Sequence, residues 1–360
     1  MKIRNVILCL SAGALLLAAC KKEQTPQTDV SNKDYKEAVP EKYLLKLHGL
    51  GVDTSNVFAY KGMIYAENDY AFSPKFLDTV TPKLRGGRGA TTEQFQTTQL
   101  LNYNNIRFNV PYAVRLESKY YSAISIAMYN WNGVNSGLYF HRTTQSAFDI
   151  DVRLGSLPWN QFGGLLAVAD FPGYPDANGF PGYDIVINKD FIDYLQLTSQ
   201  QIGKIVTHEI GHQLGFRHSD YYNGETPGDI GAIQIPGTPY SDPNSLMKAA
   251  FSLSDNGYSI FTANDLVAIN ALYPNTGCNA TAFVDYPSVI SGSDLGAGLW
   301  APYLGGQSYE WEVTGPNGFY FYSNDGENGV YLNPGTYVIK HRFSTATCTT
   351  PWAQKTVTVN

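Results

Sequence analysis

The most restrictive feature of the sequence is the segment 208–218, which reads HEIGHQLGFRH. On an α-helix, His208 and His212 lie one turn apart on the same face, so both imidazoles can reach one cation. Gly215 can adopt a positive φ, which would end the helix and turn the chain back. That reversal would bring in a third nitrogen from His218. We therefore predict one metal ion bound by these three histidines.

The residue that follows the first histidine gives this predicted site its chemistry. Three protein ligands leave a fourth position open, which is typical of catalytic rather than structural zinc. Glu209 would lie beside a metal-bound water without filling the coordination shell, where it can act as the general base in peptide hydrolysis. We therefore expect a zinc-dependent endopeptidase with one catalytic Zn²⁺, and no pattern indicates a structural Ca²⁺. The other histidines are expected to be structural or exposed: His48, His141 and His341.

The whole motif resembles that of the metzincin zinc metallopeptidases, and its HEIGH core resembles the dual-action HEIGH metallopeptidase family within that group. The resemblance implies a matrixin-like catalytic domain, in which a methionine lies in a tight turn beneath the metal. Met247 follows the last histidine of the motif and is the only methionine after it, so we assign it to this Met-turn. The position two residues later, where some metzincins carry a tyrosine, is Ala249.

The resemblance also extends to the segments around the motif. Residues 164–169 resemble the edge strand that borders the cleft in matrixin-like members, 182–188 the strand before the active-site helix, and 261–273 the final helix. An edge strand would let a peptide substrate add as one more strand. The alternative is a strand paired on both sides within the sheet. The candidate substrate-binding residues are Leu165, Leu166, Ala167 and Val168.

Residues 95–275 alternate strand and helix patterns and predict an α+β domain. We expect a strand over 106–110, a helix over 117–131, and further helices that begin near Thr198 and Thr262. Thr198 and Gln201 have capping-box spacing. Together with the family resemblance, this order predicts a twisted sheet with an edge strand and an active-site helix.

The first twenty residues have the pattern of an export signal. Lys2 and Arg4 precede an apolar stretch that is too short to span a bilayer. The sequence LAAC at 17–20 resembles the lipobox of bacterial lipoproteins, which implies removal of residues 1–19 and lipidation of Cys20. The alternative is an ordinary signal peptide in which this cysteine is incidental. We expect an exported protein, lipid-anchored in the bacterial cell envelope at the outer membrane, facing the periplasm or the surface.

Between the lipidated cysteine and the catalytic domain we expect two further parts. Residues 20–40 are polar and predict a flexible tether. Residues 41–94 predict a small N-terminal subdomain with a short helix and one or two strands. Many latent metzincins block the metal with a cysteine, but no cysteine lies between 21 and 277. If the subdomain were inhibitory it would need another group, such as the carboxylate of Glu67 or Asp69, and we favour a merely folded subdomain.

Residues 276–360 contain short strand patterns separated by Gly, Asn and Pro turns, and predict an all-β, immunoglobulin-like sandwich. Signal cleavage removes Cys9 and lipidation occupies the next cysteine, which leaves Cys278 and Cys348 to form a disulfide. A second functional hypothesis follows, in which a surface-anchored binding protein has a structural zinc site and its sandwich binds a glycan or a protein. The candidate platform residues are Trp300, Tyr303, Trp311, Tyr320 and Tyr322, and the alternative is a sandwich core with ordinary surface tyrosines.

The net charge excludes one class of partner. A formal charge of −6 argues against a nucleic-acid-binding protein, which would carry a basic face. We expect a peptide or protein substrate, a membrane contacted through the N-terminal lipid, and a monomer.

Overall fold

The computed structural model describes residues 36–360 with internal gaps, and all of these residues belong to the unit Asp34–Asn360. The gaps are 68, 82–93, 144–145, 161–162, 171–172, 221–227, 240–241, 250–252, 254–259, 276–288, 291–298, 301–307, 325–326, 329–331 and 345–348. The expected signal peptide, the lipidated Cys20 and the expected Cys278–Cys348 disulfide lie outside the described residues and stay predictions.

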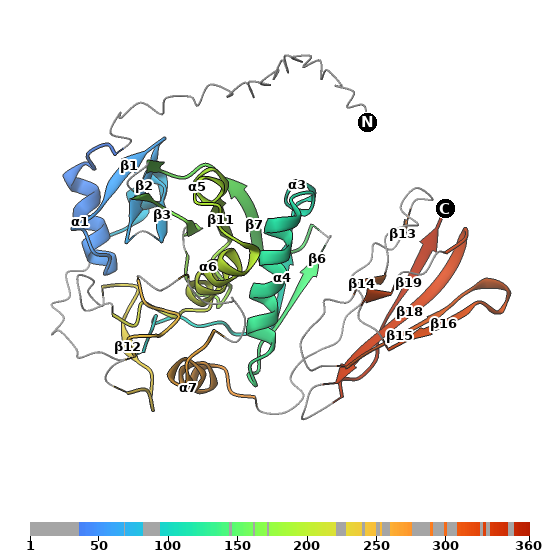
Figure 1. Ribbon diagram of the computed structural model, residues 1–360. Helices are drawn as coiled ribbons and strands as arrows, with labels where there is room; N and C mark the ends of the chain where they lie inside the picture. Colours follow the sequence, from blue (N-terminus) through green and yellow to red (C-terminus); the bar gives the residue numbers. More distant parts are fainter. Residues whose placement is uncertain are drawn as a thin grey trace, which may run out of the picture. The chain divides into compact units, whose positions relative to one another are not determined.

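The centre of the fold is an eight-stranded sheet with the order β1-β2-β3-β10-β11-β7-β5-β6 (Figure 1). Its members are β1 (Phe58–Tyr60), β2 (Met63–Ala66), β3 (Tyr70–Phe72), β5 (Asn105–Asn109), β6 (Tyr139–Thr143), β7 (Ile150–Gly155), β10 (Ala167–Asp170) and β11 (Asp184–Asn188). The strands β5, β6, β7 and β11 pair in parallel, whereas β10 runs antiparallel to β11. The mixed sheet confirms the expected α+β class.

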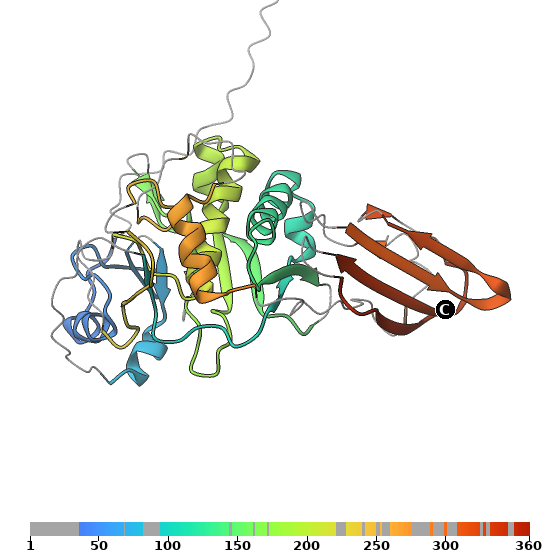
Figure 2. The same ribbon diagram turned by 90° about the horizontal axis from the view of Figure 1, so that it is seen from below.

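Two long helices cover one face of this sheet, α4 (Ser118–Asn132) and α6 (Ser199–Gln213) (Figures 1 and 2). Strand β11 shows why the sheet has two apolar faces, because its side chains alternate. Ile185 and Ile187 are buried in the core beneath the helices, while Val186 belongs to the cluster on the opposite face. The helices approach closely at Gly203, where a Cβ would lie 2.7 Å from Cγ2 of Ile126.

The N-terminal part, residues 36–81, has its own small core and adds three strands to the sheet. Helix α1 (Glu41–Leu50) is followed by Gly51, whose φ of 99° lies in the left-handed region that ends many helices. The helix α2 (Pro74–Thr79) follows β3, and the two helices and three strands share a buried cluster that includes Leu47 and Phe72. The sequence predicts one or two strands here, whereas the structure has three.

Strand β3 changes the expected position of the substrate-binding strand. It pairs in parallel with β10, with Tyr70 opposite Ala169. The expectation of an edge strand at 164–169 is therefore corrected: β10 lies between β3 and β11, and begins only at Ala167. The physical reason is that the N-terminal part supplies a strand to the side of β10 that faces away from β11.

The C-terminal part is all-β, as expected. Five strands form one sheet in the order β13-β19-β18-β15-β16, and β14 pairs with β17. Trp311 is buried in its core with Ile339 and Val357, so its assignment to a binding platform is corrected, whereas Tyr320 and Tyr322 are exposed. The finer expectation of an immunoglobulin-like sandwich stays a prediction. The strands are β13 (Val289–Ile290), β14 (Leu299–Trp300), β15 (Ser308–Thr314), β16 (Tyr320–Ser323), β17 (Glu327–Asn328), β18 (Gly335–Ser344) and β19 (Ala353–Val359).

The remaining elements are short. They are β4 (Phe95–Gln96), α3 (Tyr112–Arg115), β8 (Trp159–Asn160), β9 (Gly163–Gly164), α5 (Lys189–Tyr194), β12 (Ile233–Gln234), α7 (Ala263–Leu272) and η3 (Pro316–Gly318). Within the described ranges, no helix has the length and apolar character needed to cross a membrane.

Candidate metal centre

Helix α6 carries the first two histidines of the motif. The helix begins with the predicted capping box: Thr198 accepts a hydrogen bond from the backbone of Gln201, whose side chain in turn accepts one from the backbone of Thr198. The helix buries all residues from Ile202 to Gln213, so the motif lies in its most enclosed half. Consequently His208 and His212 both point into the interior of the protein, with exposures of 1% and 0%.

Gly215 reverses the chain after α6. Its φ is 97°, in the left-handed region that the sequence predicts and that glycine adopts most easily. A Cβ at this position would also lie 2.8 Å from Oγ1 of Thr97, so space as well as conformation favours glycine. After the turn, His218 comes back toward the helix and is fully buried.

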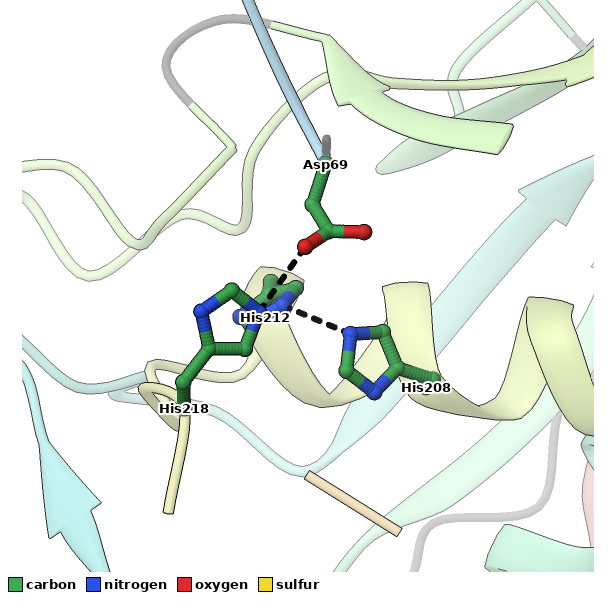
Figure 3. A group of neighbouring side chains, drawn as sticks. All are labelled: Asp69, His208, His212 and His218. Carbon is green, nitrogen blue, oxygen red and sulfur yellow. Dashed lines mark hydrogen bonds and ion pairs between the residues drawn. The ribbon is translucent and has the colours of Figure 1, made fainter. Parts of the chain in front are cut away.

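The three imidazoles meet at one point, together with a carboxylate from the N-terminal part (Figure 3). One ligand atom from each of Asp69, His208, His212 and His218 lies within 4.8 Å of the others. The Nε2 atoms of His208 and His212 are 3.0 Å apart, and Oδ2 of Asp69 is 2.9 Å from Nε2 of His218. The structure thus brings together the three predicted histidines and adds a fourth group.

Backbone carbonyl groups orient two of these imidazoles. Nδ1 of His208 donates to the carbonyl of Leu246 at 2.7 Å, and Nδ1 of His212 donates to the carbonyl of Phe216 at 2.8 Å. Because Nδ1 carries the proton in each ring, Nε2 presents a lone pair toward the centre. Burial lowers the pKa of His208 to about 4, and burial with the two neighbouring imidazoles lowers the pKa of His212 well below its usual value. The neutral form, which binds metals, is therefore favoured.

These residues fit a zinc ion by chemistry and by spacing. Three imidazoles and one carboxylate are a donor set that zinc takes in proteins. Ligand atoms about 2.0 Å from a tetrahedral zinc lie about 3.3 Å from one another. Two contacts in the cluster, at 2.9 Å and 3.0 Å, are near this spacing. We conclude that the cluster is compatible with zinc binding.

Glu209 lies next to the cluster but is not part of it. Its side chain is 1% exposed, and its Oε2 has no hydrogen-bond partner among the described residues. Burial and the nearby carboxylate of Asp69 raise the pKa of Glu209 well above its usual value. A buried carboxylate with a free acceptor atom beside a cation site is suited to accept a proton from a water molecule.

Met247 packs against α6, and its assignment to a Met-turn stays a prediction. It is 3% exposed, and a Cβ on Gly211 would lie 2.4 Å from its sulfur. The segment that carries it is fixed by Asp265 of α7, which accepts hydrogen bonds from the backbone of Leu246 and from the hydroxyl of Ser245. This segment therefore connects the final helix to the first histidine. The sequence analysis missed Asp265, although its capping-box spacing with Thr262 was a usable signal.

The candidate substrate-binding residues precede or begin β10. Leu165 and Leu166 lie before the strand, and the backbone of Leu165 donates to Pro158. Ala167 and Val168 belong to the strand and are buried, with Val168 in the cluster on the face away from the helices. In this structure the backbone of Ala169, the next residue, donates to the carbonyl of Asp69 at 3.0 Å.

The N-terminal part supplies two further contacts to the cluster, one from the turn before β3 and one from the first residue of β3. Besides the carboxylate of Asp69, the hydroxyl of Tyr70 lies 2.8 Å from Nδ1 of His212, and Oε2 of Glu67 lies 3.7 Å from Nδ1 of His218. The two carboxylates are the ones that the sequence analysis named as candidates for an inhibitory group. Nothing local in the sequence placed them at the metal.

The sequence model of the family described as dual-action HEIGH metallo-peptidases matches residues 74–273, which is more than half of the chain. The match includes the whole histidine motif and Met247, and begins after the turn that carries Asp69. A search of curated proteins finds no match. On the family match and the buried histidine cluster, the chain belongs to the dual-action HEIGH metallo-peptidase family and is a metallopeptidase.

Proposed function

We propose that the protein is a zinc-dependent endopeptidase in which Glu209 is the general base. The observation that supports this most strongly is the position of Glu209, buried directly beside the cluster of histidines with an unused acceptor atom. When bound, zinc would polarise the scissile carbonyl and lower the pKa of a water molecule. His208, His212 and His218 would hold the ion, because one ring nitrogen of each lies within 4.8 Å of the others.

The chain's own residues would move the proton. Glu209 accepts one proton from the attacking water as the new C–O bond forms, and then passes that proton to the nitrogen of the leaving amine as the C–N bond breaks. No covalent enzyme intermediate is required, and water and peptide give one carboxylic acid and one amine.

The alternative, a binding protein with a structural metal site, has one observation in its favour. Asp69 brings a fourth ligand atom to the cluster, as a closed structural site would require. However, a structural site has no use for a second buried carboxylate, and Glu209 lies within the same enclosed space. For this reason we favour the enzyme.

We also propose a location and a set of partners, on the sequence features alone. The basic residues and the apolar stretch before Cys20 support export and lipid anchoring in the bacterial cell envelope. We propose a monomer that acts on peptides or proteins. The domain division of signal, tether, N-terminal subdomain, catalytic domain and β-sandwich belongs to the same proposal.

The function is tested by incubating the zinc-loaded protein with a peptide library and mapping the cleavages by mass spectrometry. Because Asp69 lies in the metal cluster, the wild-type protein and Asp69→Asn are both assayed, with and without 1,10-phenanthroline. We expect internal cleavages in at least one of the two proteins, their loss with the chelator, and their return on addition of zinc. Absence of cleavage by both zinc-loaded proteins, or cleavage that the chelator leaves unchanged, would contradict the proposal.

A further inference from the structure

The turn between β2 and β3 reaches the metal centre from a part of the chain far from the histidine motif. Asp69 and the first histidine are separated by more than a hundred residues, yet the carboxylate points at the three imidazoles (Figure 3). Its Oδ2 is 2.9 Å from Nε2 of His218, the distance of neighbouring atoms around one cation. The fourth position, which a catalytic zinc site keeps for water and substrate, therefore has a protein ligand in this conformation.

The end of this turn and the start of β3 also cover the backbone of β10. Tyr70 pairs with Ala169 in a parallel register, and the carbonyl of Asp69 accepts a hydrogen bond from the backbone of Ala169. An extended peptide that added to this side of β10 would need these main-chain groups. Hence one short segment occupies both the fourth ligand position and part of the strand edge next to it.

Two contacts accompany the carboxylate and hold the turn in place. The hydroxyl of Tyr70 is 2.8 Å from Nδ1 of His212, and the ring of Tyr70 packs edge-on against that imidazole. Glu67 has φ 57°, a backbone conformation that non-glycine residues rarely adopt. The turn therefore contains one residue in the left-handed region and is followed by a tyrosine that contacts the metal centre.

The remainder of the N-terminal part is docked on the catalytic domain by apolar packing and backbone hydrogen bonds. Phe72 is 1% exposed in a cluster that includes Tyr174 of the catalytic domain. The backbone of Ile230 donates to the carbonyl of Leu50, and the buried guanidinium of Arg217 donates to the carbonyl of Gly51. The three imidazoles and Glu209 are carried by α6 and the segment that follows it, so release of the N-terminal segment would leave them on their own elements.

We propose that residues 41–80 keep the metal centre latent, with Asp69 as the displaceable fourth ligand and β3 as the strand that covers β10. The inference rests on the proposed function, because only an enzyme needs this position for its substrate. A peptide and the N-terminal segment compete for the same groups, and the enzyme is active only in the state in which the segment has moved away. The segment inhibits the same chain that carries it. The group that blocks the metal is a carboxylate oxygen in place of the cysteine sulfur of many latent metzincins.

The proposal is tested with the Co²⁺-substituted full chain and acetohydroxamate, a small chelator that needs the fourth position. Binding is followed by the visible absorption of Co²⁺. We expect Asp69→Asn to bind acetohydroxamate about 100-fold more tightly than the wild type. This factor corresponds to a wild type in which about 1% of the molecules are in the open state, because only that state binds the chelator. Asp78→Asn removes a carboxylate from the same segment, on α2, and serves as the matched control with wild-type affinity.

Equal affinities of the wild type and Asp69→Asn, each with one bound Co²⁺, would overturn the proposal. Loss of Co²⁺ from Asp69→Asn would also overturn it, since Asp69 would then be a permanent ligand. A measurement on the wild type alone covers the case in which the variant does not fold. Saturating acetohydroxamate should speed amide hydrogen exchange at Ala71 and Phe72, and unchanged exchange would contradict displacement of the segment.

The experiment distinguishes failure of this inference from failure of the proposed function, because neither acetohydroxamate affinity nor amide hydrogen exchange depends on peptide cleavage. A raised affinity for acetohydroxamate in Asp69→Asn without any peptidase activity would leave the ligand assignment standing and reject the enzyme. Full peptidase activity of the wild type, unchanged in Asp69→Asn, would support the enzyme and reject latency.

Discussion

The backbone carbonyl of Leu246 accepts a hydrogen bond from Nδ1 of His208 at 2.7 Å, and this contact links the Met-turn segment to the metal centre. The backbone N–H of Leu246 in turn donates to Asp265 at 3.0 Å. Asp265 also accepts hydrogen bonds from Ser245 and Gln94, and is 3% exposed. A carboxylate on the last helix of the catalytic domain thus positions a predicted metal ligand through the backbone of one residue, Leu246.

We expect Asp265→Ala to weaken metal binding by about 10-fold, because outer partners of metal ligands fix their orientation. The unfolding free energy should fall by about 1–3 kcal/mol, since several buried donors lose their acceptor. Affinity is measured by competition with a chromogenic chelator, and stability by urea unfolding. Asp190→Ala, at an exposed carboxylate in the first turn of α5, is the control. Unchanged metal affinity in Asp265→Ala would show that this connection does not orient His208.

Gly211 and Met247 form a pair whose coupling can be measured. A helix interior favours Ala over Gly by about 1 kcal/mol, yet a Cβ at Gly211 would lie 2.4 Å from the sulfur of Met247. We expect Gly211→Ala to destabilise the wild type by about 1–2 kcal/mol through overpacking. In the Met247→Ala background, which itself costs about 2–5 kcal/mol, the same change should be neutral or stabilising. Additive effects in a double-mutant cycle would mean that the two residues do not pack as described.

Asp193 makes stability depend on pH near α5. Burial alone would raise its pKa, but hydrogen bonds from Lys119, Lys189 and Tyr120 lower the pKa to about 2. The ionised form is therefore stabilised by folding, and this contribution is present above the unfolded pKa of about 3.9 and is lost as the pH falls toward 2. We expect Asp193→Asn to cost less than about 1 kcal/mol at pH 7, because the side chain is 40% exposed.

The difference between Asp193→Asn and the wild type should shrink between pH 4 and pH 2, as followed by urea unfolding at several pH values. Asp190→Asn, on the same helix, is expected to show a smaller difference at pH 7. A cost for Asp193→Asn that stays constant down to pH 2 would exclude the ionised carboxylate as its source.

Docking of the N-terminal segment can be weakened without touching the metal ligands. Phe72 is fully buried in the N-terminal cluster, so Phe72→Ala should cost about 3–5 kcal/mol of local stability. We expect faster amide exchange in β1–β3 and tighter binding of acetohydroxamate to the Co²⁺ protein. Phe343→Ala, at an equally buried phenylalanine in the C-terminal sheet, controls for general destabilisation. If Phe72→Ala and Phe343→Ala raise the affinity for acetohydroxamate equally, weaker docking of the N-terminal segment is not the cause.

The sequence was sufficient for the features of the centre that depend on local spacing. The four-residue interval of His208 and His212, the capping box at Thr198 and the positive φ of Gly215 each follow from helix geometry, and the structure contains all three features. The order of strands and helices in the catalytic domain follows from the same kind of periodicity. The position of Met247 came from the family resemblance.

The contribution of Asp69 could not be predicted, because it depends on a long-range pairing. A carboxylate after a short strand has no local signature of a metal ligand, and the parallel register of Tyr70 with Ala169 joins segments about a hundred residues apart. For the same reason the sequence predicts an edge strand at β10, where the structure has a strand paired on both sides. Only the absence of cysteine between 21 and 277 pointed toward a carboxylate.

The central claim is that Glu209 moves the proton in a metal-dependent peptide hydrolysis. The most direct measurement compares the cleavage rate of one library peptide by Asp69→Asn and by Asp69→Asn/Glu209→Gln, each shown to contain one zinc per chain. We expect the second protein to keep zinc and to cleave about 10²–10⁴-fold more slowly, the usual contribution of a general base. Equal rates in the two zinc-loaded proteins would contradict the account.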